Sequence, residues 1–389
     1  MDKGRGTGQA DQHGDEHGDE YGELHLIDWD LAGSLGRRLI SSGPKVAPEE
    51  AAQAVAELRD CALAAQEPVA VTTGLRTGPD APPARVVDRG RWIEANVASF
   101  RVMFEPVLRT VAQRSRAAGR PAPPEAFQTV SGKLTGAEVA ALLAYLSGKI
   151  LGQYDLAPGR PADRASLLLV APNIVEVERE LGVDPRDFRL WVCLHEETHR
   201  VQFTAVPWLR EHMLAETDAL AVGLAPDPDA MMQRIRELAG NLREVVSPGG
   251  SGLAGLFLSP EQKARVARLT AVMSLLEGHA DVVMDEVGPQ VVPSVAEIRR
   301  KFEKRRDGLG IFDVMIRRLL GMEAKMAQYR TGAVFVRGVM DQVGLEGFNA
   351  VWSGPEQLPR PEEIAEPRLW VDRVHGRAAI TGGGAGARP

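Results

Sequence analysis

Residues 188–203 (FRLWVCLHEETHRVQF) contain the feature that most constrains this chain. His195 and His199 are four residues apart, and on an α-helix this spacing places both imidazoles on one face. Glu196 follows the first histidine, about 100° around such a helix. The pattern is H-E-x-x-H, in which two histidines hold zinc and the glutamate acts as general base. We therefore predict a helix that presents His195 and His199 as zinc ligands and Glu196 as a catalytic carboxylate.

The residues around the motif fit a helix, but the motif alone does not decide the chemistry. Apolar side chains recur every three or four residues, and Asp184-Pro185 resembles an N-cap followed by a first-turn proline. Zinc peptidases of this type usually have uncharged residues between the glutamate and the second histidine, whereas here the first of these is Glu197. The alternative is an amphipathic surface helix whose histidines lie near carboxylates. The zinc hypothesis therefore requires a third ligand.

A later apolar segment, residues 272–287 (VMSLLEGHADVVMDEV), supplies candidates for that ligand. Glu277 and Asp281 share a helix face, as a ligand and a carboxylate that accepts the free N–H of a ligating histidine would. His279 is about 200° around the helix from Glu277, so the two cannot both point at one ion. We predict Glu277 as the third ligand and Asp281 as the supporting carboxylate, because His₂Glu sets are established for catalytic zinc. His279 as the ligand, and a purely structural helix, stay open.

HEETH followed on another helix by E-x-x-x-D resembles the glutamate-zincin type of zinc metallopeptidase. More closely, the chain resembles a bacterial family of zincin-like proteins, described as zinc-dependent metalloproteases or hydrolases associated with biosynthesis of a deazaflavin coenzyme. The resemblance covers roughly residues 26–374. The stretches that carry it are IDWDLAGSLGRRL, RGRWIEANVASF, LLLVAPNIVEVERELGVDPRDFRLWVCLHEETHRVQFTAVPWL, LLEGHADVVMD and GFNAVWSGPEQLPRPEEIAEPRLWVDRV.

The resemblance implies a mostly α (α+β) architecture, namely a zincin-like metallopeptidase fold with a short sheet and large helical extensions. It also implies Zn²⁺ as the cofactor, with His195, His199 and Glu277 as ligands and Glu196 as base. It implies no known substrate.

The chain has 389 residues, enough for one large or two medium domains. Residues 1–24 carry hardly any apolar side chain and are predicted to be a disordered tail, and residues 376–389, which contain Thr-Gly-Gly-Gly, a flexible one. Between these tails we expect a helical N-terminal region over residues 25–162 and a zincin-like catalytic region over residues 163–375.

Residues 165–170 (ASLLLV) are the clearest strand candidate, since they form an apolar run bounded by proline-containing turns. The resemblance gives this strand a role as the edge that pairs with an extended peptide substrate. Asn173 is predicted to cap the next helix. Residues 247–255 (SPGGSGLAG) lack the lysine and the spacing of a phosphate loop, so they are predicted to be a mobile loop, with a role as a lid left open.

Three further residues have side chains suited to stabilising the oxyanion of a tetrahedral intermediate: His212, Tyr329 and Arg330. Nothing in their spacing selects among them. We rank Tyr329 first as the additional catalytic residue.

Charge and cysteine content restrict the partners and the compartment. A net charge of −7 and a pI near 5.7 argue against nucleic acid as the main partner. Cys61 and Cys193 each lie in a helical pattern, so a disulfide framework is excluded and a cytoplasmic location is predicted. No signal-peptide pattern and no long apolar run occur, so we expect no membrane partner. Homo-oligomerisation stays open.

Two functional hypotheses follow. The first is a zinc hydrolase that cleaves a peptide or other amide bond, in which Glu196 takes a proton from water and passes it to the leaving amine. The second is a catalytically silent zincin fold that binds or assembles enzymes of deazaflavin coenzyme biosynthesis. A metal-free helical protein is a third possibility.

Overall fold

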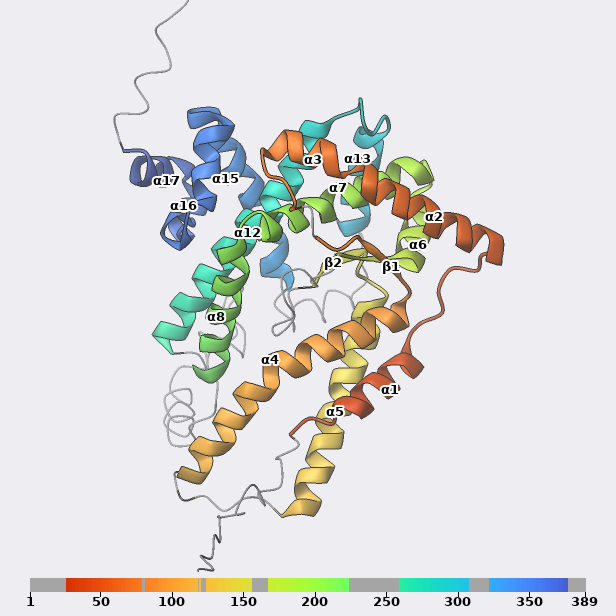
Figure 1. Cartoon of the computed structure of the whole chain (residues 1–389), viewed down its shortest axis with the longest axis vertical. Coiled ribbons are helices and arrows are strands. Elements are labelled where there is room, and N and C mark those ends of the chain that lie inside the picture. The colour runs from red at the N-terminus through yellow and green to blue at the C-terminus, as the bar shows by residue number, and fades with distance from the viewer. Residues whose placement is uncertain are drawn as a thin grey trace, which may run out of the picture.

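The computed structural model is mostly helical, with one small sheet near its centre (Figure 1). This confirms the predicted fold class. Both predicted tails lie outside the described residues, apart from Gly376, as do the glycine-rich loop at 247–255 and the predicted boundary between residues 162 and 163. The residues that the structure describes are 26–78, 81–117, 119, 124–155, 167–223, 259–307 and 322–376.

The sheet has the strand order β1 (Arg85–Val87), β3 (Leu167–Val170), β2 (Gly152–Tyr154). β3 is parallel to β1 and antiparallel to β2, and all four of its residues are buried. The strand predicted at 165–170 is therefore confirmed over 167–170. Its predicted place at the sheet edge is wrong, because β1 and β2 occupy both sides of β3 and leave no room for a substrate strand. β1 and β2 come from the predicted helical N-terminal region, so one sheet joins both predicted regions.

Of the helices before β3, α1, α4 and α5 form the lower part of Figure 1, whereas α2 lies at the upper right and α3 at the top. α1 begins after Asp28, whose side chain accepts a hydrogen bond from the backbone N–H of Leu31. α1 packs closely on α5 because position 136 is glycine: a Cβ atom there would lie 2.5 Å from the carbonyl oxygen of Asp28. The bounds are α1 (Trp29–Leu39), α2 (Pro48–Ala64), α3 (Gln66–Thr73), α4 (Arg89–Ala117) and α5 (Glu125–Ser147).

The helices after β3 include the two that carry the predicted motifs. The motif helix, α7, starts as predicted, since the Asp184 side chain accepts from the Asp187 N–H and Pro185 occupies the first turn. The other candidate helix, α12, starts with a capping box between Ser259 and Gln262. The bounds are α6 (Ala171–Leu181), α7 (Pro185–Thr204), α8 (Pro207–Gly223), α12 (Pro260–Val287), α13 (Val295–Asp307), α15 (Met322–Phe348), α16 (Pro361–Ala365) and α17 (Pro367–Val374).

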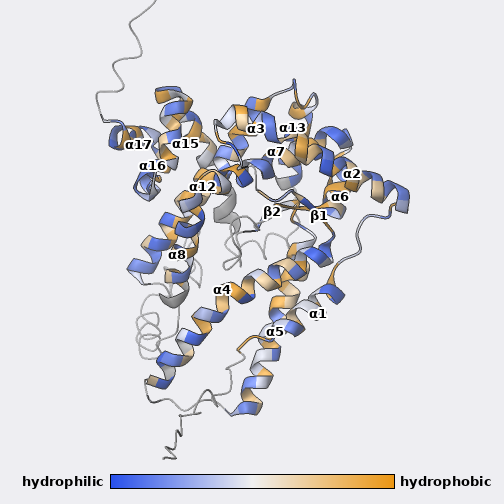
Figure 2. Ribbon diagram, viewed as in Figure 1, coloured by the Kyte–Doolittle hydropathy of each residue, from blue (hydrophilic) through white to orange (hydrophobic). Residues whose placement is uncertain are grey.

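Most helices have a hydrophobic and a hydrophilic side (Figure 2), and their hydrophobic sides meet around α7 and α12. α12 and α15 approach each other most closely at Gly278 and Gly332, since a Cβ atom at position 278 would lie 2.1 Å from the Gly332 carbonyl carbon. This contact places α15 directly beside Glu277. No helix among the described residues is long and apolar enough to cross a membrane.

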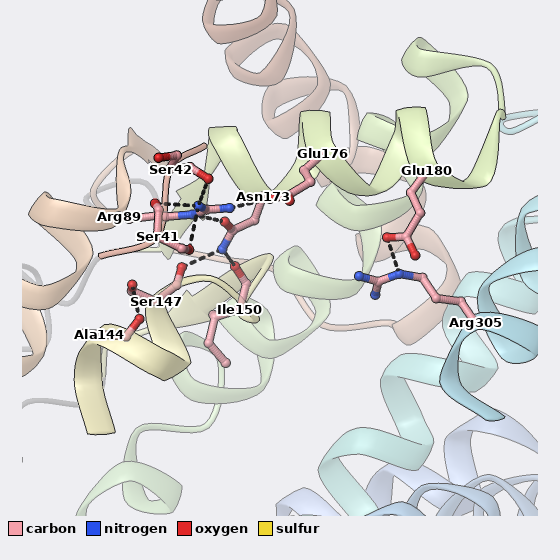
Figure 3. Close-up of polar contacts among 10 residues, drawn as sticks. All are labelled: Ser41, Ser42, Arg89, Ala144, Ser147, Ile150, Asn173, Glu176, Glu180 and Arg305. Carbon is pink, nitrogen blue, oxygen red and sulfur yellow. Dashed lines mark hydrogen bonds and ion pairs between the residues drawn. The ribbon is translucent and has the colours of Figure 1, made fainter. Parts of the chain in front are cut away.

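A buried polar cluster, the Arg89–Asn173 junction, joins the start of α4, the end of α5 and the first turn of α6 (Figure 3). Asn173 lies inside the first turn of α6, so its prediction as an N-cap is wrong. Its Nδ2 donates to the carbonyl oxygens of Ser147 at 2.7 Å and Ile150 at 2.6 Å, and its Oδ1 accepts from Arg89 Nε at 2.6 Å. The remaining nitrogens of Arg89 donate to four acceptor groups: the carbonyl and the hydroxyl of Ser41, the carbonyl of Ser42, and the carboxylate of Glu176.

Candidate metal centre

Three potential ligand atoms from α7 and α12 converge on one point. The Nε2 atoms of His195 and His199 lie 3.2 Å apart. Glu277 Oε2 lies 3.6 Å from His195 Nε2 and 3.5 Å from His199 Nε2. Ligands around a tetrahedral zinc ion at about 2.0–2.1 Å are about 3.3 Å from one another. The three side chains therefore fit three corners of a zinc site. In the described part of the chain, this is the one cluster of three potential His, Cys, Asp or Glu ligands.

The electrostatic environment of this point favours positive charge. Burial by itself lowers the pKa of His199, but the charge of Glu277 and its hydrogen bond, followed by Glu196 and Gln202, outweigh burial and raise that pKa to about 9. The imidazole thus lies in a negative field, as expected where a cation binds.

Glu196 is 7 % exposed, and its carboxyl group lies against β2. A Cβ atom at position 152 would lie 2.5 Å from Glu196 Cδ, so only a glycine at this position leaves room for the carboxyl group. Burial raises the pKa of Glu196 to about 7, with smaller opposing effects of His199, which lowers it, and Glu277, which raises it. A carboxyl group with a pKa near neutrality suits a general base.

His279, the alternative ligand, lies outside the convergent cluster. Its ring packs between Phe348 and Trp352, with centroid distances of 5.3 and 5.4 Å. Burial, with a smaller effect of the His199 charge, lowers the pKa of His279 to about 3, so its imidazole is neutral. The helical rotation that separates residues 277 and 279 explains why Glu277, and not His279, faces the imidazoles of α7.

Gln202 is a residue that the sequence analysis missed. Its Oε1 lies 3.0 Å from His199 Nδ1, and its Nε2 lies 3.0 Å from both the Leu276 carbonyl oxygen and His279 Nδ1. The available signal was its place three residues after the second histidine, on the same helix face.

Asp281 does not have the predicted role toward His199. Its Oδ1 accepts from Arg299 at 3.2 Å, which joins α12 to α13. The partner of His199 Nδ1 is Gln202, and His195 Nδ1 lies 3.3 Å from the sulfur of Met284. Four residues along α12 move a side chain about 6 Å along the helix axis, which carries Asp281 away from Glu277 and toward α13.

The charged residue inside the motif has a structural explanation. Glu197 is buried, and it accepts hydrogen bonds from Arg200 at 3.1 Å and from the Thr77 hydroxyl at 3.4 Å. Burial raises the pKa of Glu197, opposed by Arg200. Cys193, also on α7, is fully buried in the core, and its Sγ lies 3.9 Å from the Leu58 carbonyl oxygen. Glu197 thus attaches α7 to the segment before β1.

The oxyanion candidates are only partly described. His212 on α8 makes an edge contact with the ring of Trp208. The side chains of Tyr329 and Arg330 lie outside the described residues, although their backbone belongs to α15. Tyr329 is one turn before Gly332, the glycine that contacts α12.

Comparison with known proteins agrees with this geometry. A family model described as zincin-like metallopeptidase matches residues 27–371. The chain belongs to this zincin-like metallopeptidase family. Its structure is also similar to the crystal structure of a "putative hydrolase with a novel fold" from Chloroflexus aurantiacus, with a TM-score of 0.61 and 30% sequence identity over 90% of this chain and 99% of the other. The search of curated proteins gave no match. Family membership confirms the zincin-like resemblance, whereas neither match bears on deazaflavin coenzymes.

Proposed function

We propose that this zincin-like protein is a zinc-dependent metallopeptidase or related hydrolase that cleaves a peptide or other amide bond. The convergence of the two imidazoles and the Glu277 carboxylate, at mutual distances of 3.2–3.6 Å, carries this proposal. His195, His199 and Glu277 would hold the zinc ion. When bound, zinc supplies Lewis-acid polarisation of a carbonyl group and of water.

The protein's contribution to proton transfer is assigned to Glu196. A carboxylate next to the first ligand can take a proton from the attacking water and later give it to the leaving amine. Burial raises the pKa of Glu196, which favours uptake of that proton by its carboxylate. Gly152 supports this role, because its missing side chain lets the carboxyl group lie against β2.

β2 takes the substrate-pairing role first predicted for β3. It is an outer strand of the sheet and it lies beside Glu196, so an extended peptide added to β2 would pass the catalytic carboxylate. Reciprocal amide hydrogen bonds between Gln153 and Asn96, at 3.0 and 3.3 Å, attach the strand to α4. Stacking of Tyr154 on Phe203 attaches it to α7. A strand fixed on both faces is a suitable template for a substrate backbone.

Tyr329 remains the proposed oxyanion-stabilising residue, since the crossing of α15 with α12 brings its helix beside Glu277. A positioned donor of this kind is worth about 10²-fold in rate. Tyr329→Phe should therefore lose about that factor in turnover while retaining zinc. A cytoplasmic location and a link to deazaflavin coenzyme biosynthesis complete the proposal, and both rest on the sequence.

The test combines metal content with hydrolysis. Native protein purified without added metal should contain about one zinc per chain, and His195→Ala and Glu277→Ala should contain close to none. A peptide library should be cleaved by the native protein and not by Glu196→Gln, which should keep its zinc. Zinc retention without cleavage of any amide substrate would instead favour the catalytically silent binding protein. Absence of zinc from the native protein would contradict both.

A further inference from the structure

We infer that Gln202 is a positioning residue, which fixes the tautomer of His199 so that Nε2 faces the metal point. The inference rests on the proposed zinc function. It starts from a group whose hydrogen-bonding role is certain: the backbone carbonyl of Leu276, which can only accept. The end of the Gln202 amide that lies 3.0 Å from this carbonyl must therefore be the NH₂ group.

The opposite end of the same amide is then the carbonyl oxygen, Oε1, and it lies 3.0 Å from His199 Nδ1. Since Oε1 can only accept, Nδ1 must carry a hydrogen. In a neutral imidazole this leaves the lone pair on Nε2. That is the nitrogen 3.2 Å from His195 Nε2 and 3.5 Å from Glu277 Oε2. The Leu276 carbonyl thus fixes the orientation of the Gln202 amide, and through it the Nδ1–H tautomer of His199 that metal binding requires.

His279 uses the second hydrogen of the NH₂ group. Its Nδ1 lies 3.0 Å from Gln202 Nε2, so it accepts, and its own hydrogen lies on Nε2. Gln202 has no exposed surface, so water cannot replace any of its three contacts. Rotating the amide by 180° would place its oxygen against the Leu276 carbonyl oxygen, so that two acceptors would face each other without a hydrogen between them. His279 and Leu276 together therefore hold the amide in one orientation.

The same contact also aligns the two ligand helices. Gln202 belongs to α7, as do both histidines, and Leu276 directly precedes Glu277 on α12. The two helices are therefore joined beside the ligands. His195 has a different arrangement, because the atom beside its Nδ1 is the Met284 sulfur, a weaker acceptor than an amide oxygen.

Three substitutions test the hydrogen bonds of Gln202 separately. Gln202→Leu removes both the acceptor for His199 and the donors. Gln202→Glu keeps an acceptor for His199 and removes the donors to Leu276 and His279. His279→Phe removes an acceptor of the amide and keeps the contact with His199. Loss of a hydrogen-bonding partner behind a metal ligand typically costs 10- to 100-fold in metal affinity.

The first measurement is the zinc dissociation constant, by competition with a chelator. Gln202→Leu should bind zinc about 10- to 100-fold more weakly. The zinc dissociation constant of Gln202→Glu should stay within about tenfold of the native value, because the acceptor of the His199 N–H is retained. His279→Phe also retains this acceptor, and its dissociation constant should be close to the native one. Equal losses in the Leu and Glu variants would overturn the inference, because the amide would then act only by joining α7 to α12. Native affinity in Gln202→Leu would overturn it as well.

The second measurement needs no zinc, because it tests the hydrogen bond from His199 Nδ1–H to Gln202 Oε1, which forms whether the imidazole is neutral or protonated. With ¹⁵N-labelled histidine, nuclear magnetic resonance should show a slowly exchanging Nδ1–H proton of His199, identified by its absence in His199→Gln. This signal should persist in Gln202→Glu and disappear in Gln202→Leu. Its absence from the native protein, or its persistence in Gln202→Leu, would refute the inference even if zinc binds. If the signal behaves as expected and the native protein binds no zinc, the proposed function fails instead, and with it the purpose assigned to the tautomer.

Discussion

The metal centre and the Arg89–Asn173 junction are both buried and polar, yet their groups are combined differently. In the junction, the guanidinium of Arg89 and the amide of Asn173 meet carbonyl, hydroxyl and carboxylate acceptors, so donors face acceptors (Figure 3). In the metal centre, two imidazole nitrogens and a carboxylate oxygen face one another at 3.2–3.6 Å. Burial of polar groups therefore does not identify a functional site; convergence of ligand atoms on one point does.

The two regions are also supported differently. The junction is held by its own hydrogen bonds. In the metal centre, the Gln202 hydrogen bonds are supplemented by close approach at two glycines, since Gly152 lies against the Glu196 side chain and Gly278 against the backbone of α15. We expect substitutions in the junction to change stability, and those in the metal centre to change zinc binding or catalysis.

Arg89→Met should give the largest loss of stability. Without the guanidinium, the buried amide oxygen of Asn173 and the carbonyl groups of Ser41 and Ser42 lose their donor, at a cost of about 1–3 kcal/mol for each group left unsatisfied. Urea unfolding measures this loss, and the zinc content of the folded protein should not change. Arg305→Met is the matched control, since it removes only a pair with the half-exposed Glu180 and should cost at most about 1 kcal/mol. Equal costs for the two variants would remove the distinction drawn for the junction.

Removal of zinc should lower the free energy of unfolding, and this effect should depend on the metal ligands and not on the Arg89–Asn173 junction. A ligand that binds only the folded state at 1,000 times its dissociation constant adds about 4 kcal/mol to the free energy of unfolding. Thermal unfolding of the native protein should therefore shift downward with a chelator. His199→Ala should show no such shift, whereas Arg89→Met should retain it. A chelator effect of the same size in His199→Ala would contradict the assigned ligand.

Gly152→Ala should separate catalysis from metal binding. Because the new Cβ would lie 2.5 Å from Glu196 Cδ, the carboxyl group must move. Displacement of a catalytic group by about 1 Å can cost about 10²-fold in rate. Peptide hydrolysis should fall by that order, while zinc content should remain at the native level. Unchanged turnover would show that Glu196 has room to adjust.

Gly278→Ala should lower the free energy of unfolding by at least about 1–3 kcal/mol, the range typical of overpacking, because the new Cβ would lie 2.1 Å from the Gly332 carbonyl carbon. It should also weaken zinc binding, because the crossing of α12 and α15 lies next to Glu277. Gly33→Ala is the control, since the nearest atom would lie 3.9 Å from the new Cβ and alanine favours the helix. Chelator competition and urea unfolding of both variants test this difference. Native zinc affinity in Gly278→Ala would show that the crossing does not set the position of Glu277.

Local sequence patterns predicted the elements that depend on neighbouring residues. The capped helix around the H-E-x-x-H motif is present as α7, and the apolar run at 165–170 contains β3. β1 and β2, with three residues each, are too short to show an alternating pattern, so the run was mistaken for an edge strand. Asn173 was mistaken for a cap because its amide bonds to segments far away in sequence.

The sequence by itself determined which residues are chemically able to form the site, because the spacing of residues along a helix fixes which side chains share a face. Only the tertiary structure decided which of these side chains meet. The crossing of α7 with α12 brings Glu277 to the histidines and places His279 within hydrogen-bonding distance of Gln202. Asp281 instead accepts a hydrogen bond from Arg299. The physical reason is that contacts between helices depend on their crossing angle and depth of packing. Here that depth is set by glycines and core side chains that no local pattern records.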